Sequence, residues 1–403
     1  GGDHGFESRM RHQARNKTIK GGNMSETATL IERDRRFAQI REAMAKDNLV
    51  ALIVGGHGAS FTRGYIRYFS DAHMWAGDSL IIIPLDGEPV HVLVANADAS
   101  MPDKLWIPDY RKNPNPHDEI VSVMKQRGIT KGRVGIGGFD KVITVGAYEA
   151  LRNSFPNISF VNSDMLVDRV RARKSALEIR QIREHLDFSR KAMDKFVEIA
   201  SPEITEREAA AEVVRVARVG GIWDDLTKIQ VSGVSVLPRD IPLDCTDLLG
   251  FHLEICGPSG HWSELNVTCA FREPTAAEAG LLKTELRAFE EVCKMAKPGV
   301  TLGEFATAFE QAIVEDGWKL GEPEWHYFLH GQGMDSIEWP YYTRMLEENR
   351  DVPLEEGMVF SYHPHRDTVP SAGNPRVFDD IVITETGAER LSGDWDLGWR
   401  IMQ

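Results

Sequence analysis

Residues 251–271 read FHLEICGPSGHWSELNVTCAF. Apolar and polar residues alternate on both sides of a GPSG break, which is the pattern of two β-strands joined by a short turn. Because side chains alternate between the faces of a strand, His252 and Glu254 share one face of the first strand, and Glu264 and Asn266 share one face of the second. This hairpin either forms one wall of an active site or presents an ordinary polar face to solvent.

The composition is that of a globular protein with several domains. The 403 residues include 42% hydrophobic and 27% charged side chains, and the length suggests two or three domains. The net charge of -14 argues against nucleic acid or an anionic membrane as a partner. No apolar run approaches the ~20 residues that a membrane span requires. We therefore expect a small-molecule substrate, and neither nucleic acid nor membrane.

Two further features concern the cellular setting. Cys245, Cys256, Cys269 and Cys293 show no CxxC spacing, which indicates reduced thiols and a cytoplasmic location. Residues 1–23 are polar and basic and lack the apolar segment of a secretory signal. We expect them to be a disordered tail or a remnant left by cloning, with Met24 as the natural start.

Strand and helix patterns alternate over the first part of the chain. Helical spacing of apolar residues over 27–47 precedes a buried strand at 50–56 and a hairpin that turns at Asp86 and Gly87. Helices near 117–127 and 145–154 then alternate with the strands RVGIGG and ISFVNS. This order predicts an α/β N-terminal domain over residues 24–164.

The second part of the chain has a different, duplicated order. Residues 174–200 predict a long amphipathic helix, and a second helix runs from Thr205 to Gly220. The hairpin follows, then helices at 276–296 and 302–316, then the strand-like segments HYFLHGQG, GMVFSYHP and RVFDDIVITETG. We predict an α+β domain over residues 165–403, with a curved, mainly antiparallel sheet backed by helices.

Five segments of this second part, in order, resemble the creatinase, aminopeptidase P and methionine aminopeptidase (M24-type) superfamily: KSALEIRQIR, KPGVTLGEF, HGQGMDSIEWP, EEGMVFSYHP and VFDDIVITETG. The resemblance implies the pita-bread fold for the C-terminal domain. The α/β domain in front of it points to the creatinase and aminopeptidase P branch rather than to the shorter methionine aminopeptidases. That branch implies a homodimer, with the N-terminal domain near the partner's active site.

The metal ligands of this superfamily match much less well. Its peptidases bind two divalent metals through two hairpin aspartates, a histidine and two glutamates. The resemblance places the following residues at these positions in turn: His252 or Glu254, Asn266, His330, His363 and Asp379. A further family histidine corresponds to Ile337, in front of Glu338. Because histidine and asparagine do not offset the charge of two divalent cations, we do not expect a standard dinuclear site.

Creatinase, which also lacks the metal ligands, hydrolyses a C–N bond with a histidine at the position of His330. Our leading hypothesis is accordingly a creatinase-like hydrolase or lyase without a metal, acting on a small polar, carboxylated substrate. Gly331 and Gly333 follow His330, which predicts an accessible turn. The expected catalytic residues are His330, His363, Glu264 and Asp379, as imidazoles and carboxylates that exchange protons.

The expected substrate-binding residues are His252, Glu254, His261, Asn266, Glu338, Arg63 and Arg67. The two arginines, in FTRGYIRYF of the N-terminal domain, would hold a substrate carboxylate at the partner's active site.

Two alternatives remain open. One is an Xaa-Pro-type metallopeptidase with an altered mononuclear site, in which His330, His363 and Asp379 hold one zinc, iron or manganese ion. The other is a non-catalytic pita-bread binding module. Convergence of these three side chains in the fold would favour an enzyme, and scattering would favour the binding module.

Overall fold

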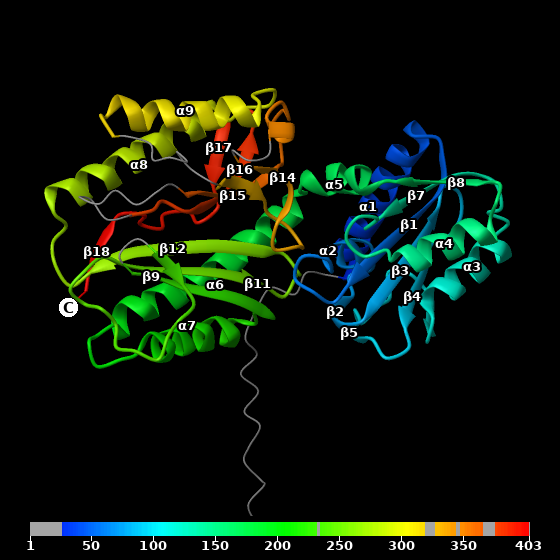
Figure 1. Ribbon diagram of the computed structural model, residues 1–403, viewed down its shortest axis with the longest axis horizontal. Helices are drawn as coiled ribbons and strands as arrows, with labels where there is room; N and C mark the ends of the chain where they lie inside the picture. The colour runs from blue at the N-terminus through cyan, green and yellow to red at the C-terminus, as the bar shows by residue number, and fades with distance from the viewer. Residues whose placement is uncertain (1–25, 232–233, 319–326, 344–346, 366–374, 403) are drawn as a thin grey trace, which may run out of the picture.

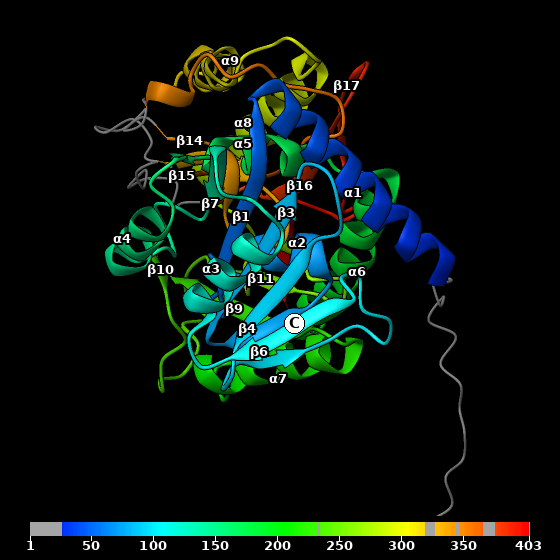
Figure 2. The ribbon, with the colours of Figure 1, turned by 90° about the vertical axis from the view of Figure 1, so that its right-hand side faces the viewer.

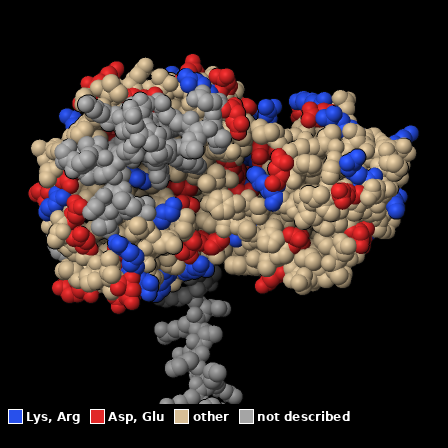
Figure 3. All heavy atoms as spheres, viewed as in Figure 1, with Lys and Arg blue, Asp and Glu red and all other residues tan. Residues whose placement is uncertain are grey.

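The chain folds into two halves that lie side by side along the long axis of the molecule (Figure 1). The computed structural model describes residues 26–231, 234–318, 327–343, 347–365 and 375–402. The predicted tail of residues 1–23 lies outside these ranges. Among the helices of the described ranges, none is both long and apolar enough to cross a membrane. Figure 3 shows Lys and Arg interspersed with Asp and Glu over the viewed face.

The strands of the N-terminal half are β1 (Leu49–His57), β2 (His73–Ala76), β3 (Asp78–Pro84), β4 (Val90–Val94), β5 (Asp98–Ser100), β6 (Asp109–Asn113), β7 (Gly132–Gly137) and β8 (Ile158–Asn162). Six of them form one mixed sheet in the order β6-β4-β3-β1-β7-β8, while β2 and β5 pair separately. The predicted hairpin is confirmed, because β3 and β4 pair antiparallel. Gly87 between them has a φ of 113°, which explains a glycine at that turn.

The helices of this half are α1 (Glu26–Lys46), α2 (Gly64–Ser70), α3 (Pro116–Gln126), α4 (Val145–Ser154) and α5 (Asp164–Ala172). Leu52 and Val54 of β1 join the core beneath α1 and α2, whereas Ala51 and Ile53 join the core beneath α3 and α4 (Figure 2). Both faces of the sheet are therefore covered. The sequence did not predict α2, because all seven of its residues are buried and show no amphipathic pattern.

Two five-stranded sheets form the C-terminal half. The first has the order β10-β9-β11-β12-β18 and the second the order β14-β13-β15-β16-β17. The first contains β9 (Asp224–Val231), β10 (Val234–Val236), β11 (Leu249–Cys256), β12 (Trp262–Ala270) and β18 (Trp399–Ile401). The second contains β13 (Tyr327–Gly331), β14 (Glu338–Tyr342), β15 (Val359–His365), β16 (Asp379–Thr384) and β17 (Gly387–Arg390), with the short 3₁₀ helix η1 (Glu347–Asn349) after β14.

A pair of helices backs each of these sheets. Figure 1 shows α6 (Ala176–Ile199) and α7 (Glu206–Gly220) beneath the first sheet, and α8 (Ala276–Met295) and α9 (Leu302–Glu315) above the second. The pairing is antiparallel apart from the short edge strand β18, which runs parallel to β12. The predicted pita-bread architecture is confirmed.

The hairpin of β11 and β12 turns its polar side chains inward. His252 pairs with Asn266 and Glu254 with Glu264, so all four side chains lie on one face. All four are buried, with Glu264 only 1% exposed. The opposite face packs on helix α6, where the rings of Phe251 and Phe196 lie 4.7 Å apart. The alternative of a solvent-facing polar strand pair is therefore wrong.

His330 lies within strand β13 and not in a turn, contrary to our expectation. The strand continues through Gly331 and is paired on both sides, with β14 and with β15. His330 is only 2% exposed. The glycines that follow it end the strand, and they do not free the ring from packing.

Candidate active site

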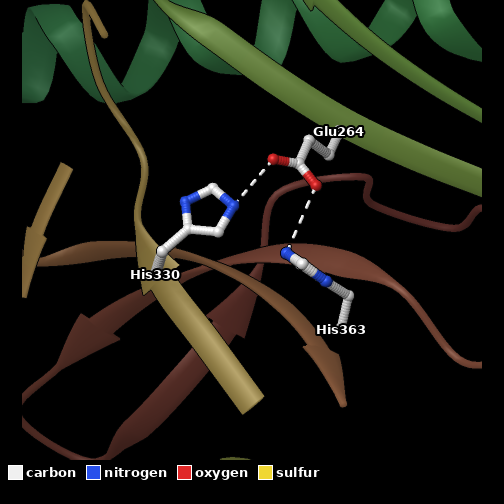
Figure 4. Close-up of side chains that lie close together, drawn as sticks. All are labelled: Glu264, His330 and His363. Carbon is white, nitrogen blue, oxygen red and sulfur yellow. Dashed lines mark ion pairs between the residues drawn. The ribbon is translucent and has the colours of Figure 1, made fainter. Parts of the chain in front are cut away.

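Glu264 lies at the centre of a buried group of imidazoles and carboxylates between the two sheets. It comes from β12, whereas His330 comes from β13 and His363 from β15 (Figure 4). Its Oε1 lies 2.9 Å from His330 Nε2, and its Oε2 lies 3.5 Å from His363 Nε2. Three strands from distant parts of the sequence thus bring one carboxylate and two imidazoles together.

His252 and Glu254 extend this group along β11. His252 Nε2 lies 3.0 Å from Glu254 Oε1 and 3.9 Å from Glu264 Oε2. Ser336 Oγ donates a hydrogen bond of 3.3 Å to Glu254 Oε2. We call His252, Glu254, Glu264, His330 and His363 the histidine-glutamate cluster.

Neighbouring groups set the protonation of the cluster. Burial by itself lowers the pKa of His330, but the charge and hydrogen bond of Glu264 and the Gly331 carbonyl outweigh burial and raise that pKa above its ordinary value. Burial by itself raises the pKa of Glu254, but the hydrogen bond to His252 and the charges of His252, His330 and Lys228 lower it overall. Glu254 is therefore a carboxylate at neutral pH, and His330 holds a proton more readily than a free histidine.

The donor atoms of Glu264, His330 and His363 fit a single divalent ion. These atoms all lie within 4.8 Å of one another. Two imidazoles and one carboxylate also form the ligand set of several catalytic zinc sites. Glu264 Oε2 is buried and has no hydrogen-bond partner among the described residues, so its lone pairs are available to a cation. Glu264 also belongs to a second group of the same extent, together with His252 and Glu254.

A phenylalanine closes one side of the cluster. The ring centroid of Phe378 lies 5.2 Å from that of His252, with an angle of 85° between the planes, and 5.1 Å from that of His363. Phe378 is 4% exposed and directly precedes β16. The sequence did not single it out, because an apolar residue at the start of a strand has the pattern of an ordinary core residue.

Asp379 does not join the cluster, which corrects the expectation that it is an acid-base residue or a metal ligand. Its Oδ2 accepts hydrogen bonds from Arg390 Nε and Ser392 Oγ, both at 2.6 Å. Successive side chains of a strand face opposite sides, so Phe378 faces the cluster and Asp379 faces away. The convergence expected of an enzyme is found for His330 and His363, with Glu264 in place of Asp379.

The two arginines expected to hold a substrate carboxylate already pair with aspartates. Arg63 Nη2 lies 3.0 Å from Asp224 Oδ2. Arg67 Nη2 lies 3.0 Å from Asp71 Oδ1 and also donates to the Pro258 carbonyl. Neither arginine contacts the cluster within the described part of the chain, and both reach from the N-terminal half to the C-terminal half.

Glu338 and His261, both expected to bind substrate, are buried in ionic networks outside the cluster. Glu338 pairs with Arg171 and Lys174. Burial by itself raises the pKa of Glu338, but the two cations and the hydrogen bonds from Lys174 and the Asp335 backbone lower it to about 2. His261 Nε2 lies 3.4 Å from Glu178 Oε1.

Lys228 and Asn266 flank His252 on the neighbouring strands, because both are its partners in the sheet register. Asn266 Nδ2 donates a hydrogen bond of 2.9 Å to the Arg376 carbonyl. Lys228 is half-buried, and its ammonium forms no hydrogen bond or ion pair with any described residue. We did not anticipate Lys228, since the register of β9 against the hairpin cannot be deduced from the sequence.

Comparisons with known proteins cover almost the whole described chain. The family model "Metallopeptidase family M24" matches residues 180–385, and "Creatinase/Prolidase N-terminal domain" matches residues 36–173. The chain is 24% identical over 335 residues to the Xaa-Pro dipeptidase of Pyrococcus furiosus, covering 81% of this chain and 90% of that protein. It is 26% identical over 298 residues to the putative dipeptidase YkvY of Bacillus subtilis, covering 70% of this chain and 77% of that protein.

Solved structures show the same fold. The dipeptidase PepE from Mycobacterium ulcerans superposes with a TM-score of 0.74 at 18% identity, covering 93% of this chain and 98% of that one. The prolidase from Pyrococcus horikoshii gives a TM-score of 0.69 at 23% identity, covering 89% of this chain and 97% of that one. At these identities the likeness concerns the fold.

Proposed function

Because this chain belongs to metallopeptidase family M24, we propose that it is a hydrolase that cleaves the C–N amide bond of a short peptide. The observation that carries the proposal is the buried convergence of Glu264, His330 and His363. Relatives named Xaa-Pro dipeptidase make dipeptides with proline in the second position the first substrates to test. This proposal favours the metallopeptidase alternative over our leading sequence-based hypothesis of a metal-free creatinase-like enzyme.

We assign Glu264, His330 and His363 as the residues that would hold one divalent ion, with zinc, iron and manganese as the metals that suit imidazole and carboxylate donors. Such an ion, when bound, activates water near neutral pH and polarises the scissile carbonyl. The chain's own residues would hold the ion between the two sheets, where burial excludes bulk water and strengthens electrostatic interactions.

We assign Glu254 as the residue that accepts the proton of the attacking water. Its lowered pKa keeps it ionised, and hydrogen bonds from His252 and Ser336 fix its two oxygens. During hydrolysis the water oxygen forms a bond to the carbonyl carbon and the C–N bond breaks. The proton held by Glu254 then passes to the leaving nitrogen, so the products are an acid and an amine.

We assign Lys228 to the free carboxylate of the dipeptide. It lies beside His252 in the sheet register, and it is the cation on β9 whose charge lowers the pKa of Glu254. Its ammonium has no hydrogen-bond or ion-pair partner among the described residues, so it is available to an anion. Lys228 belongs to the chain's own site, whereas Arg63 and Arg67 were expected at the active site of a partner.

The test is hydrolysis of an Xaa-Pro dipeptide by the chelator-treated protein before and after zinc, iron or manganese is restored. We expect activity to disappear with the metal and to return with one of the three. Hydrolysis that persists unchanged in metal-free protein would contradict the metal-dependent mechanism.

The raised pKa of His330 supports a second candidate function, metal-free C–N cleavage of the creatinase kind. An imidazolium at His330, held by Glu264 at 2.9 Å, could protonate a leaving nitrogen directly. Turnover of a small carboxylated amide or amidine in the presence of chelator, with no turnover of Xaa-Pro dipeptides, would favour this function over the peptidase.

A further inference from the structure

The number of metal ions that the site accepts is not decided by its donor atoms alone. Glu264 belongs to two overlapping groups of donors, one with His330 and His363 and the other with His252 and Glu254. The atoms of each group lie within 4.8 Å of one another, so each has the dimensions of a metal site. The surroundings must therefore determine whether one or both groups are filled.

Charge disfavours filling both groups. Within the cluster, only Glu254 and Glu264 are carboxylates, and the other three members are imidazoles. Two divalent cations would leave two positive charges uncompensated in a buried site, and Lys228 on the neighbouring strand adds another. Uncompensated buried charge is strongly unfavourable.

Phe378 occupies the side of the cluster from which the last long strand could supply another carboxylate. Its ring lies against His252 and His363, one from each group. Neither aspartate that follows it takes its place. Asp379 faces away and is held by Arg390 and Ser392. Asp380 accepts hydrogen bonds from the Glu264 backbone N–H and from Gln332 Nε2, so both of its oxygens are already engaged. The cluster therefore contacts an apolar ring at the point where a second ion would need an oxygen ligand.

We propose that Phe378 restricts the site to a single metal ion, held by Glu264, His330 and His363, and keeps the pair of His252 and Glu254 free of metal. The inference rests on the proposed function, because it presumes that a metal binds at Glu264. Replacing Phe378 by an acidic residue supplies both an oxygen donor between the two groups and a compensating charge. Such a variant gains a second ion.

The experiment counts metal ions per folded chain by elemental analysis and by calorimetric titration with Mn²⁺ or Zn²⁺. The proteins are wild type, Phe378→Glu, Phe378→Asp and, as an apolar control, Phe378→Leu. We expect one ion for wild type and for the leucine variant, and two for at least one acidic variant. Thermal unfolding of each protein verifies that it is folded.

Two ions in the wild-type protein would overturn the inference while leaving the proposed function intact. Folded acidic variants that bind only one ion would also overturn it. If neither acidic variant folds, the wild-type count decides between one ion, as proposed, and two. Absence of metal from every protein would instead remove the proposed metal site, and the inference with it.

Discussion

Glu264 carries more of the site than any other single residue, because its carboxylate faces the imidazoles of His252, His330 and His363. We expect Glu264→Gln to lose the bound metal and to reduce Xaa-Pro dipeptide hydrolysis by about a hundredfold or more, since the charge disappears while the shape is kept. Metal content and kcat/KM of the purified variant measure this.

The matched control for that variant is Glu278→Gln. Glu278 is also a buried glutamate in an ion pair, with Arg272, but it lies at the start of α8 and away from the cluster. The Glu278→Gln protein should bind metal and hydrolyse substrate as the wild type does. Equal metal content and activity in both variants would contradict the central position of Glu264.

Lys228 leads to a prediction about substrate selection. Lys228→Met keeps the length of the side chain but removes its charge, so we expect KM for Xaa-Pro dipeptides to rise about tenfold, the loss of roughly 1.4 kcal/mol. The same dipeptides with an amidated C-terminus should show no such change. Lys195→Met is the control, since Lys195 is a half-buried lysine on α6 that pairs with Glu198. An equal effect on acid and amide substrates would exclude a carboxylate-binding role.

Individual residues show which parts of the site could be predicted from the sequence and which could not. The alternation of the hairpin correctly paired His252 with Glu254 on one strand and Glu264 with Asn266 on the other. That both pairs lie on the same face follows only from the strand register. For Phe378 and Asp379 the sequence was insufficient, since neighbouring strand residues face opposite sides and nothing in FDD indicates which side is the interior. Chemical type favoured the aspartate, but the structure places the phenylalanine at the cluster.

At the scale of elements, the helices that back the two sheets all begin with the same device. Ser175, Thr205, Thr275 and Thr301 each cap a helix, and a glutamate three residues later returns the hydrogen bond. These capping boxes explain why α6, α7, α8 and α9 could be predicted closely from the sequence. The strands β14, β17 and β18 could not, because they have three to five residues and carry polar side chains.

We expect Thr301→Ala to lower the free energy of unfolding by about 1 kcal/mol, because the first turn of α9 loses its cap. Thr307→Ala serves as the control within the same helix. The Thr307 hydroxyl donates a hydrogen bond to the Gly303 carbonyl in the helix interior. Loss of this hydroxyl should be neutral or slightly stabilising. Urea denaturation compares the two, and equal destabilisation would contradict the capping interpretation.

Strand β4 contains a buried histidine that makes stability depend on pH. Burial lowers the pKa of His91 to about 3, compared with about 6.5 in an unfolded chain. Between these values the unfolded state binds the proton and the folded state does not. Stability is therefore lost as the pH falls below about 6.5, by up to roughly 1.4 kcal/mol per pH unit.

We expect His91→Gln to reduce that dependence, because glutamine keeps a partner for Ser79 but does not titrate. The free energy of unfolding of both proteins is measured from pH 7 to pH 4.5, and the two slopes against pH are compared. A loss of stability that is the same at every pH does not affect the slopes. Identical slopes in the two proteins would show that His91 does not contribute.

At the scale of the whole molecule, a buried ionic network joins the N-terminal half to the C-terminal half. Glu178 of α6 accepts hydrogen bonds from Arg35 and Arg36 of α1, at 2.8 Å and 3.0 Å. Removing one partner of a buried ion pair leaves the others without compensation. We expect Glu178→Gln to lower the free energy of unfolding by about 3 kcal/mol. Glu184→Gln on the same helix is the control, and equal stability of the two variants would contradict this view.

The family motifs gave the architecture of the C-terminal half correctly, because each marks a helix start or a strand of the pita-bread fold. The alternation of strand and helix patterns gave that of the N-terminal half. The boundary near residue 164, the homodimer and the cytoplasmic location stay predictions. The contacts of Arg63 with Asp224, of Arg67 with the Pro258 carbonyl and of Glu338 with Arg171 could not be foreseen, since they depend on how the two halves pack together.

The most direct test of the single-metal site is an anomalous diffraction measurement at the absorption edge of zinc or manganese, on crystals of the metal-loaded protein. We predict one anomalous peak per chain, within bonding distance of Glu264, His330 and His363. Absence of a peak at these residues would contradict the metal-dependent function, and a second peak beside His252 and Glu254 would contradict the single-metal site.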